Sequence, residues 1–182
     1  MGKRKRKSKA LQEYQTRNLS GSHSSVEIIE AGLVINPKWP WLGGSPDGIV
    51  TENGIPIGCI EIKCPYSKRT QTIKEAVTSD KKFYSTMNEG KEVKHKTNHQ
   101  YYFQIRGLLN ILELPWLDFV VYTTKDMFTE RIFCDTETWT TKMMPTLSSF
   151  YLNFISPEII IKQLIKSDKP FREEGLLPLG GA

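Results

Sequence analysis

The chain has 182 residues, enough for one domain with a sizeable hydrophobic core. Its net charge is +5, and its 38% hydrophobic content is ordinary for a soluble globular protein. No apolar run approaches the roughly 20 residues of a membrane span, and no apolar segment follows the basic N-terminus as in a secretory signal. The three cysteines, Cys59, Cys64 and Cys134, give no even disulfide framework, so we expect an intracellular, reducing environment.

The positive charge is concentrated at the N-terminus. Residues 1–17 carry seven Lys or Arg side chains and one acid, Glu13, while the other 18 basic and 19 acidic residues nearly cancel. Such a run is usually a solvated segment, and its functional interpretations are phosphate contact or nuclear import. The run from Lys3 to Lys7 therefore permits a nuclear location without demonstrating one.

The first half of the chain predicts one helix followed by short strands. In chain order we expect a helix over residues 9–17, a polar loop over 19–25, a strand or strand pair over 26–35, a turn over 45–48 and a hairpin of strands 49–50 and 58–64. Asn53 and Gly54 form the hairpin turn, because both tolerate positive φ. Pro65 ends the second strand, because it has no N–H to donate.

The second half predicts helices and strands that complete a sheet. We expect a helix over residues 70–78, a hairpin of 83–87 and 92–95, a helix through Glu113 capped by Asn98, strands 116–123 and 130–134, and a last helix from Asp135 or Thr136 that Pro145 kinks or splits. Residues 175–182 are expected to form a flexible tail. The order indicates an α/β (α+β) fold with a mixed central sheet flanked by helices.

The returning strand of the hairpin carries the first candidate site residues. Strand side chains alternate, so Glu61 and Lys63 share one face, roughly 7 Å apart, while Ile60 and Ile62 occupy the other. A single metal-bound water could lie between the tips of the two charged side chains. Taken alone, this pair more often marks a solvated edge strand than a catalytic site.

Asp47 makes the metal interpretation specific. It precedes the strand that pairs with the Glu61 strand, so the hairpin brings two carboxylates toward one place, where they repel unless a cation lies between them. Oxygen ligands favour Mg²⁺ or Mn²⁺, and the backbone carbonyl of Ile62 could add another oxygen. Lys63 would then orient the attacking water and stabilise negative charge on a phosphate.

These motifs resemble those of the PD-(D/E)XK nucleases. Gly44-Ser45-Pro46-Asp47-Gly48, then Ile60-Glu61-Ile62-Lys63-Cys64-Pro65, then His99-Gln100-Tyr101-Tyr102-Phe103-Gln104 look most like the branch of phage lambda exonuclease and YqaJ-like viral recombinase domains. The resemblance spans about residues 10–160. It implies a restriction-endonuclease-like core, with a basic helix or arm at 1–17, the nuclease domain at 18–166 and a tail at 167–182.

The resemblance also implies roles for further residues. Gln104 lies on an apolar helical stripe, where a structural hydrogen bond would explain it, but the resemblance puts it at the border of the active site. An early helix of the family carries a metal-supporting glutamate shortly before an Ala-x-x-x-Tyr pattern. Here Lys5-Arg6-Lys7-Ser8-Lys9 precede Ala10, so Glu13 is only a weak substitute. The residues expected to contact nucleic acid are Ser45, Lys68, Arg69, Lys96 and His99.

The leading hypothesis is a Mg²⁺- or Mn²⁺-dependent deoxyribonuclease, with an exonuclease on duplex DNA ends in recombination or repair preferred. An endonuclease of the same superfamily is the alternative enzyme. A catalytically impaired DNA- or partner-binding remnant is the alternative class, because the early glutamate and the family's upstream 5′-phosphate-binding helices have no counterpart in this sequence. DNA is the expected partner, no membrane is expected, a homo-oligomer is left open, and the family suggests a single-strand annealing protein.

Overall fold

The computed structural model describes residues 2–19 and 25–161 of the chain. The predicted tail over 167–182 and most of the predicted loop over 19–25 lie outside the described residues. The chain divides into two compact units, Met1–Thr136 and Glu137–Ala182. No helix among the described residues is long and apolar enough to cross a membrane.

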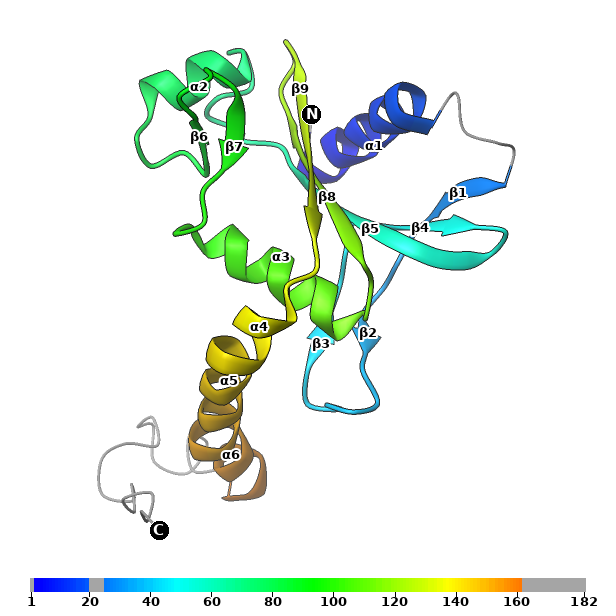
Figure 1. Ribbon diagram of the computed structural model, residues 1–182, viewed down its shortest axis with the longest axis vertical. Coiled ribbons are helices and arrows are strands. Elements are labelled where there is room, and N and C mark those ends of the chain that lie inside the picture. Colours follow the sequence, from blue (N-terminus) through cyan, green and yellow to red (C-terminus); the bar gives the residue numbers. More distant parts are fainter. Residues whose placement is uncertain (1, 20–24, 162–182) are drawn as a thin grey trace. The chain divides into compact units, whose positions relative to one another are not determined.

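A five-stranded mixed sheet forms the centre of the first unit (Figure 1). Its order is β1 (Val26–Ile29), β4 (Gly48–Glu52), β5 (Ile55–Lys63), β8 (Trp116–Tyr122) and β9 (Met127–Phe133). Only β5 and β8 are parallel neighbours, and the helical crossover that parallel strands need lies between them in sequence. The predicted fold class is therefore confirmed.

The central hairpin of β4 and β5 is built as the sequence predicts. Asn53 and Gly54 have φ angles of 51° and 78°, so the turn uses the left-handed conformation that these residue types tolerate. The strand β5 begins at Ile55, three residues earlier than predicted, and includes Pro56. A register shift between Val50 and Thr51 of β4 accommodates this proline, since an irregular pair needs no ladder hydrogen bond there.

Helices cover both faces of the sheet. On one face, α1 (Lys3–Leu19) buries Ala10 and Tyr14 completely against a cluster that includes Ile60 and Ile62 of β5. The predicted helix over 9–17 is thus confirmed in type but starts earlier, at Lys3, and the basic residues of its first turns include Lys7, which pairs with Asp47. Residues 1–17, predicted as a basic helix or arm, fall almost entirely within α1.

The opposite face carries the larger core cluster. There α2 (Ile73–Ser79) and α3 (Gln100–Ile111) pack on Cys59, Leu117, Phe119 and Val121 of β5 and β8. Thr72 caps α2 through a capping box with Glu75. The predicted cap of α3 was wrong by one residue, because His99, not Asn98, accepts the Tyr101 amide through Nδ1 at 3.2 Å.

Two short antiparallel pairs complete the first unit. They are β2 (Val34–Ile35) with β3 (Gly43–Gly44), and β6 (Ser85–Met87) with β7 (Val93–His95). The second pair is the hairpin predicted around residues 88–91. Its Lys91 adopts a φ of 58°. Helix α3 ends at Ile111, two residues before the predicted end at Glu113, and Glu113 itself adopts a left-handed φ of 54° ahead of Pro115.

The second unit is a helical segment with two π-helical turns. The elements starting near the unit boundary are α4 (Thr136–Thr138), η1 (Trp139–Met143), α5 (Met144–Phe150), η2 (Tyr151–Ile155) and α6 (Ser156–Ile161). Each π-helical turn ends two residues before a proline, Pro145 or Pro157, which has no N–H for the regular i to i−4 bond. The predicted interruption at Pro145 is confirmed, and Pro157 follows the same rule.

Candidate active site

The strand β5 places Glu61 and Lys63 on the face that α3 covers. Glu61 lies opposite Phe119 of β8 and is only 3% exposed. Lys63 is the last residue of the strand, and its ammonium lies 2.8 Å from Glu61 Oε1. The prediction that these two residues share a face is confirmed, and they form an ion pair rather than a solvated charged edge.

Helix α3 adds two side chains to this ion pair. The Lys63 ammonium donates to Gln104 Oε1 at 2.7 Å, and Gln104 Nε2 donates to Glu61 Oε1 at 2.9 Å. Tyr101, one turn earlier on α3, presents its ring centroid 3.8 Å from Lys63 Nζ. The contacts with Gln104 and Tyr101 hold the ammonium in place. Gln104 lies beside Glu61 and Lys63, where it was predicted, and bonds to both.

The carboxylate of Glu61 is satisfied on one side only. Oε1 accepts from Lys63 and Gln104, whereas buried Oε2 has no hydrogen-bond partner among the described residues. Burial is the main cause that raises the pKa of Glu61; Lys63 opposes this effect, and the negative charge of Asp47 adds to it. An unpartnered buried carboxylate oxygen is suited to a cation or a donor from a ligand.

Asp47 directly precedes the first residue of β4 and bonds to the neighbouring strand β5. The last residue pair of β4 and β5 is Gly48 with Ile60, so β5 continues beyond its neighbour. The amide of Asp47 donates to Ile60 O at 2.9 Å, and its carboxylate accepts the amide of Ile62 at 2.8 Å. Because the N–H and C=O of one strand residue face the same edge, the Ile62 carbonyl also faces the side where β4 is missing.

A lysine that the sequence did not single out completes this part of the site. Lys7 of α1 donates to both carboxylate oxygens of Asp47, each at 2.6 Å. Its side chain is 28% exposed and that of Asp47 is 19% exposed, so the pair is partly shielded from water. Lys7 also lies close enough to Glu61 to favour the charged form of that carboxylate slightly, which lowers its pKa.

The described residues hold no group of three or more His, Cys, Asp or Glu side chains placed to bind a metal ion. Glu13, the weak candidate for a further ligand, lies on α1 and pairs with Arg17 at 2.5 Å. The structure thus brings together the carboxylates of Asp47 and Glu61 and the edge of β5 that carries the Ile62 carbonyl. It does not join Glu13 to them.

Arg69 is the predicted DNA-contacting residue with the most informative surroundings. Its guanidinium lies 4.3 Å from the ring centroid of Tyr66, and the guanidinium of Arg6 lies 4.9 Å from the same ring. Tyr66 is 62% exposed and follows Lys63 by three residues. Nε and Nη1 of Arg6 are buried and have no hydrogen-bond partner within the described part of the chain. Two guanidinium groups, one from α1 and one from the segment after β5, therefore lie around an exposed aromatic ring.

The other predicted DNA contacts lie in the turn before β4, in the segment before α2 and around the start of α3. Ser45 is exposed in the turn before Asp47. Lys68 bonds Ser79 at 3.3 Å, and Lys96 donates to the Lys81 carbonyl. His99 caps α3, and its pKa is lowered, mainly by burial and then by nearby Lys96 and Lys63.

A second buried carboxylate lies on the α1 face of the sheet. Asp118 of β8 accepts two hydrogen bonds from Arg131, at 2.8 and 2.9 Å, and one from the Tyr14 hydroxyl. The Arg131 guanidinium also lies 3.7 Å from the Trp116 ring centroid. This group is not among the site residues predicted from the sequence. The only available signal was the alternation that puts Asp118 on the buried face with Val120.

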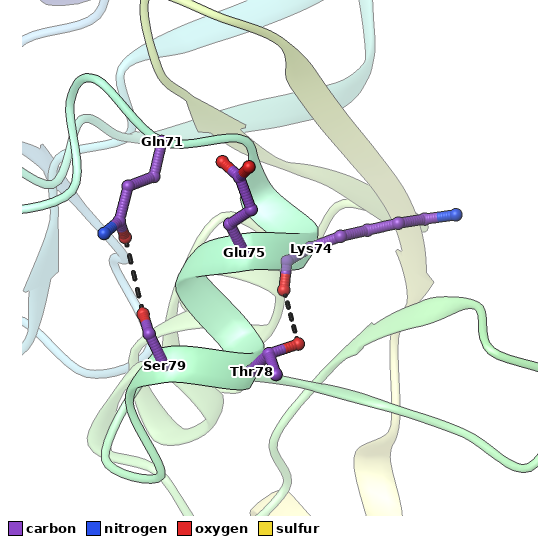
Figure 2. Close-up of a pocket in the computed structure, with 5 residues that line it drawn as sticks. All are labelled: Gln71, Lys74, Glu75, Thr78 and Ser79. Atoms are coloured by element: carbon purple, nitrogen blue, oxygen red, sulfur yellow. Dashed lines mark hydrogen bonds between the residues drawn. The ribbon is translucent and has the colours of Figure 1, made fainter.

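A surface depression lies along α2, away from these charged groups (Figure 2). It is lined by Gln71, Lys74, Glu75, Thr78 and Ser79. Its one carboxylate belongs to Glu75, which accepts the Thr72 amide at 2.7 Å, and this bond is the main cause of its lowered pKa. With a single carboxylate committed to a helix cap, the depression offers no comparable site for chemistry.

A mixed sheet whose central hairpin presents an Asp and then Glu-x-Lys defines the PD-(D/E)XK class of folds. Residues 6–114 match the family model of the YqaJ-like viral recombinase domain. The chain therefore belongs to this family.

Solved structures support the same fold. The alkaline exonuclease LHK-Exo from Laribacter hongkongensis superimposes with a TM-score of 0.60 at 23% identity, over 91% of this chain and 71% of that chain. The same exonuclease in complex with dAMP gives a TM-score of 0.60 at 24% identity over the same shares. A comparison with curated protein sequences found no match.

Proposed function

We propose that this chain is a divalent-metal-dependent DNA nuclease that cleaves phosphodiester bonds from duplex ends. The observation that carries the proposal is the half-satisfied carboxylate of Glu61 beside an ammonium fixed by three contacts. Family membership supports the chemistry, and the likeness to an alkaline exonuclease supports a preference for ends.

The oxygen donors around Glu61 fit a hard divalent cation. Glu61 Oε2, the Asp47 carboxylate and the Ile62 carbonyl would hold Mg²⁺ or Mn²⁺, which prefer oxygen ligands over the nitrogen and sulfur that zinc takes. Bound there, the ion would supply an activated water at neutral pH and offset the charge that develops on the phosphate. The observation that supports a bound cation is Glu61 Oε2, which is buried and accepts no hydrogen bond from the described residues.

The protein's own residues have distinct roles in this proposal. Lys63 stabilises negative charge on the phosphate, because its ammonium lies at the open end of β5. Gln104 is a positioning residue that orients both Lys63 and Glu61 through its amide. Burial by Phe119 and α3 keeps bulk water from the carboxylate, which strengthens every interaction with it.

The group of Arg6, Tyr66 and Arg69 would guide the DNA strand toward this centre. Guanidinium groups bind phosphate through several N–H donors, and Arg6 has two buried donors without a partner among the described residues. An exposed aromatic ring offers a base a stacking surface.

The test is an incubation of 5′-labelled linear duplex and closed circular DNA with Mg²⁺, Mn²⁺ or EDTA. We expect metal-dependent shortening of the linear duplex, an untouched circle, and no products from Glu61→Gln protein. Digestion of the linear duplex by Glu61→Gln protein at the wild-type rate would contradict the assigned site.

Two alternatives give different results in the same incubation. An endonuclease of this superfamily would also open the circle. A binding remnant would retain DNA in a salt-sensitive manner but release no product in any divalent metal. The second alternative draws support from the single acid of α1, Glu13, which is paired with Arg17.

A further inference from the structure

We propose that Lys7 is a built-in cation that occupies one of the two cation positions at the Asp47 and Glu61 carboxylates, so that the chain binds a single divalent ion there. The inference rests on the proposed function only in assuming that the site uses divalent ions. The contact that carries it is the approach of Lys7 Nζ to both oxygens of Asp47, 2.6 Å each.

The two-oxygen approach places the ammonium where a chelated ion would lie. Mg²⁺ binds carboxylate oxygens at about 2.0–2.1 Å, and an ion that bridges both oxygens lies on the bisector of the carboxylate. An ammonium equidistant from the two oxygens lies on the same bisector. Asp47 Oδ2 additionally accepts the Ile62 amide, so this oxygen is fully committed, and only Oδ1 keeps a lone pair for a divalent ion beside Lys7.

The position of Lys7 is set by the packing of α1. Lys7, Ala10 and Tyr14 lie at i, i+3 and i+7, on one face of the helix. Ala10 and Tyr14 are fully buried in the sheet cluster, and Tyr14 is further fixed by its bond to Asp118. A rigid helix therefore presents the ammonium to Asp47, and the contact does not depend on a loop.

The neighbouring carboxylate has the opposite arrangement. Glu61 Oε2 lies in a buried site without a partner among the described residues, and its other oxygen is held by Lys63 and Gln104. The helix α1 brings no acid to the site, because its acid Glu13 lies beside Arg17. One cation position is thus filled by the protein and one is left for a divalent ion.

The test is a calorimetric titration of metal-free protein with Mn²⁺, without DNA. We expect one ion for the wild type. Lys7→Met should bind Mn²⁺ more tightly, by about tenfold or more, because it removes an ammonium that repels the ion and occupies both oxygens of Asp47. Lys7→Glu should bind two ions. The matched control is Lys9→Glu, which makes the same charge change at an exposed position of the same helix.

Each result bears on the inference separately from the nuclease assay. Unchanged stoichiometry and affinity in both Lys7 variants, or an equal change in Lys9→Glu protein, would overturn the inference. If Lys7→Glu protein loses its circular-dichroism spectrum, the uncharged Lys7→Met variant decides the question. A gain of Mn²⁺ binding in variants that never cleave DNA would uphold this inference while the proposed nuclease function fails.

Discussion

Two carboxylates are buried in the central sheet on opposite faces, and each is only 3% exposed. Asp118 accepts hydrogen bonds on both oxygens, from Arg131 and Tyr14. Glu61 accepts two on one oxygen, and its other oxygen has no partner in the described part of the chain. A buried charge that the protein satisfies completely serves the fold, whereas one that it satisfies by half remains available to a ligand.

The largest effect should come from neutralising the half-satisfied carboxylate. We expect Glu61→Gln to reduce DNA cleavage by about 10²–10³-fold or more, because charge stabilisation at the reaction centre is lost. The amide keeps the shape of the side chain, so thermal unfolding should occur at the wild-type temperature or above. Cleavage rates and melting curves on the same preparation test both expectations, and a large loss of stability would mean that Glu61 serves the fold like Asp118.

The fully satisfied carboxylate should behave in the opposite way. Asp118→Asn leaves Arg131 and Tyr14 without their charged partner, which should lower the free energy of unfolding by about 3 kcal/mol. Urea denaturation measures this change. At low temperature the folded fraction should cleave DNA at nearly the wild-type rate, and an inactive but stable Asp118→Asn protein would contradict the distinction between the two carboxylates.

Gln104 tests whether the orientation of the Glu61 site matters. In Gln104→Ala protein, Lys63 and Glu61 lose the amide that joins them, and we expect a decrease of about 10–100-fold in kcat. KM should change little, because the proposed DNA-guiding residues, Arg6, Tyr66 and Arg69, do not bond to Gln104. Steady-state kinetics separate these parameters, and an increase in KM at constant kcat would assign Gln104 to DNA binding instead.

A smaller effect is expected at Tyr14. Tyr14→Phe removes one of the three hydrogen bonds to Asp118 and leaves both contacts of Arg131. The free energy of unfolding should fall by about 1–2 kcal/mol, less than for Asp118→Asn. Urea denaturation again provides the measurement. A loss as large as that of Asp118→Asn would show that the hydroxyl, rather than the guanidinium, holds the carboxylate.

The smallest effect concerns Cys59, which lies close to both carboxylates. Burial, then the charges of Glu61 and Asp118, raise the pKa of its thiol to about 12, so it stays protonated at pH 8. We expect a thiol reagent to modify exposed Cys134 and half-buried Cys64 in the native protein. Cys59 should react only after unfolding. Native labelling of Cys59, read by mass spectrometry, would mean that the core between the carboxylates opens readily.

The sequence predicted the parts of this site that depend on local geometry. Strand alternation put Glu61 and Lys63 on one face, and the Asn53-Gly54 turn brought the Asp47 end of β4 beside them. Gln104 required the family resemblance, because a polar residue on an apolar stripe has a structural explanation as well. The positions of Asp47, Glu61 and Lys63 thus follow from the two-residue repeat of a strand and from the type of hairpin turn.

The contacts of α1 could not be predicted in the same way. Tyr14 and Asp118 are 104 residues apart, and Lys7 and Asp47 are 40 apart, so only the packing of α1 on the sheet brings them together. Its position in a basic run predicts a solvated Lys7, because runs of like charge usually face water. The one available signal was the i, i+3, i+7 spacing of Lys7, Ala10 and Tyr14.

The double role of Asp47 bears on how genetic data would be interpreted. Its side chain completes the backbone pairing of β5 through Ile62 and also faces the candidate centre. Inactive alleles at position 47 would therefore mix misfolded protein with catalytically dead protein. A selection that demands normal protein abundance should recover separation-of-function alleles at Glu61, Lys63 and Gln104, and should be depleted of changes at Asp47.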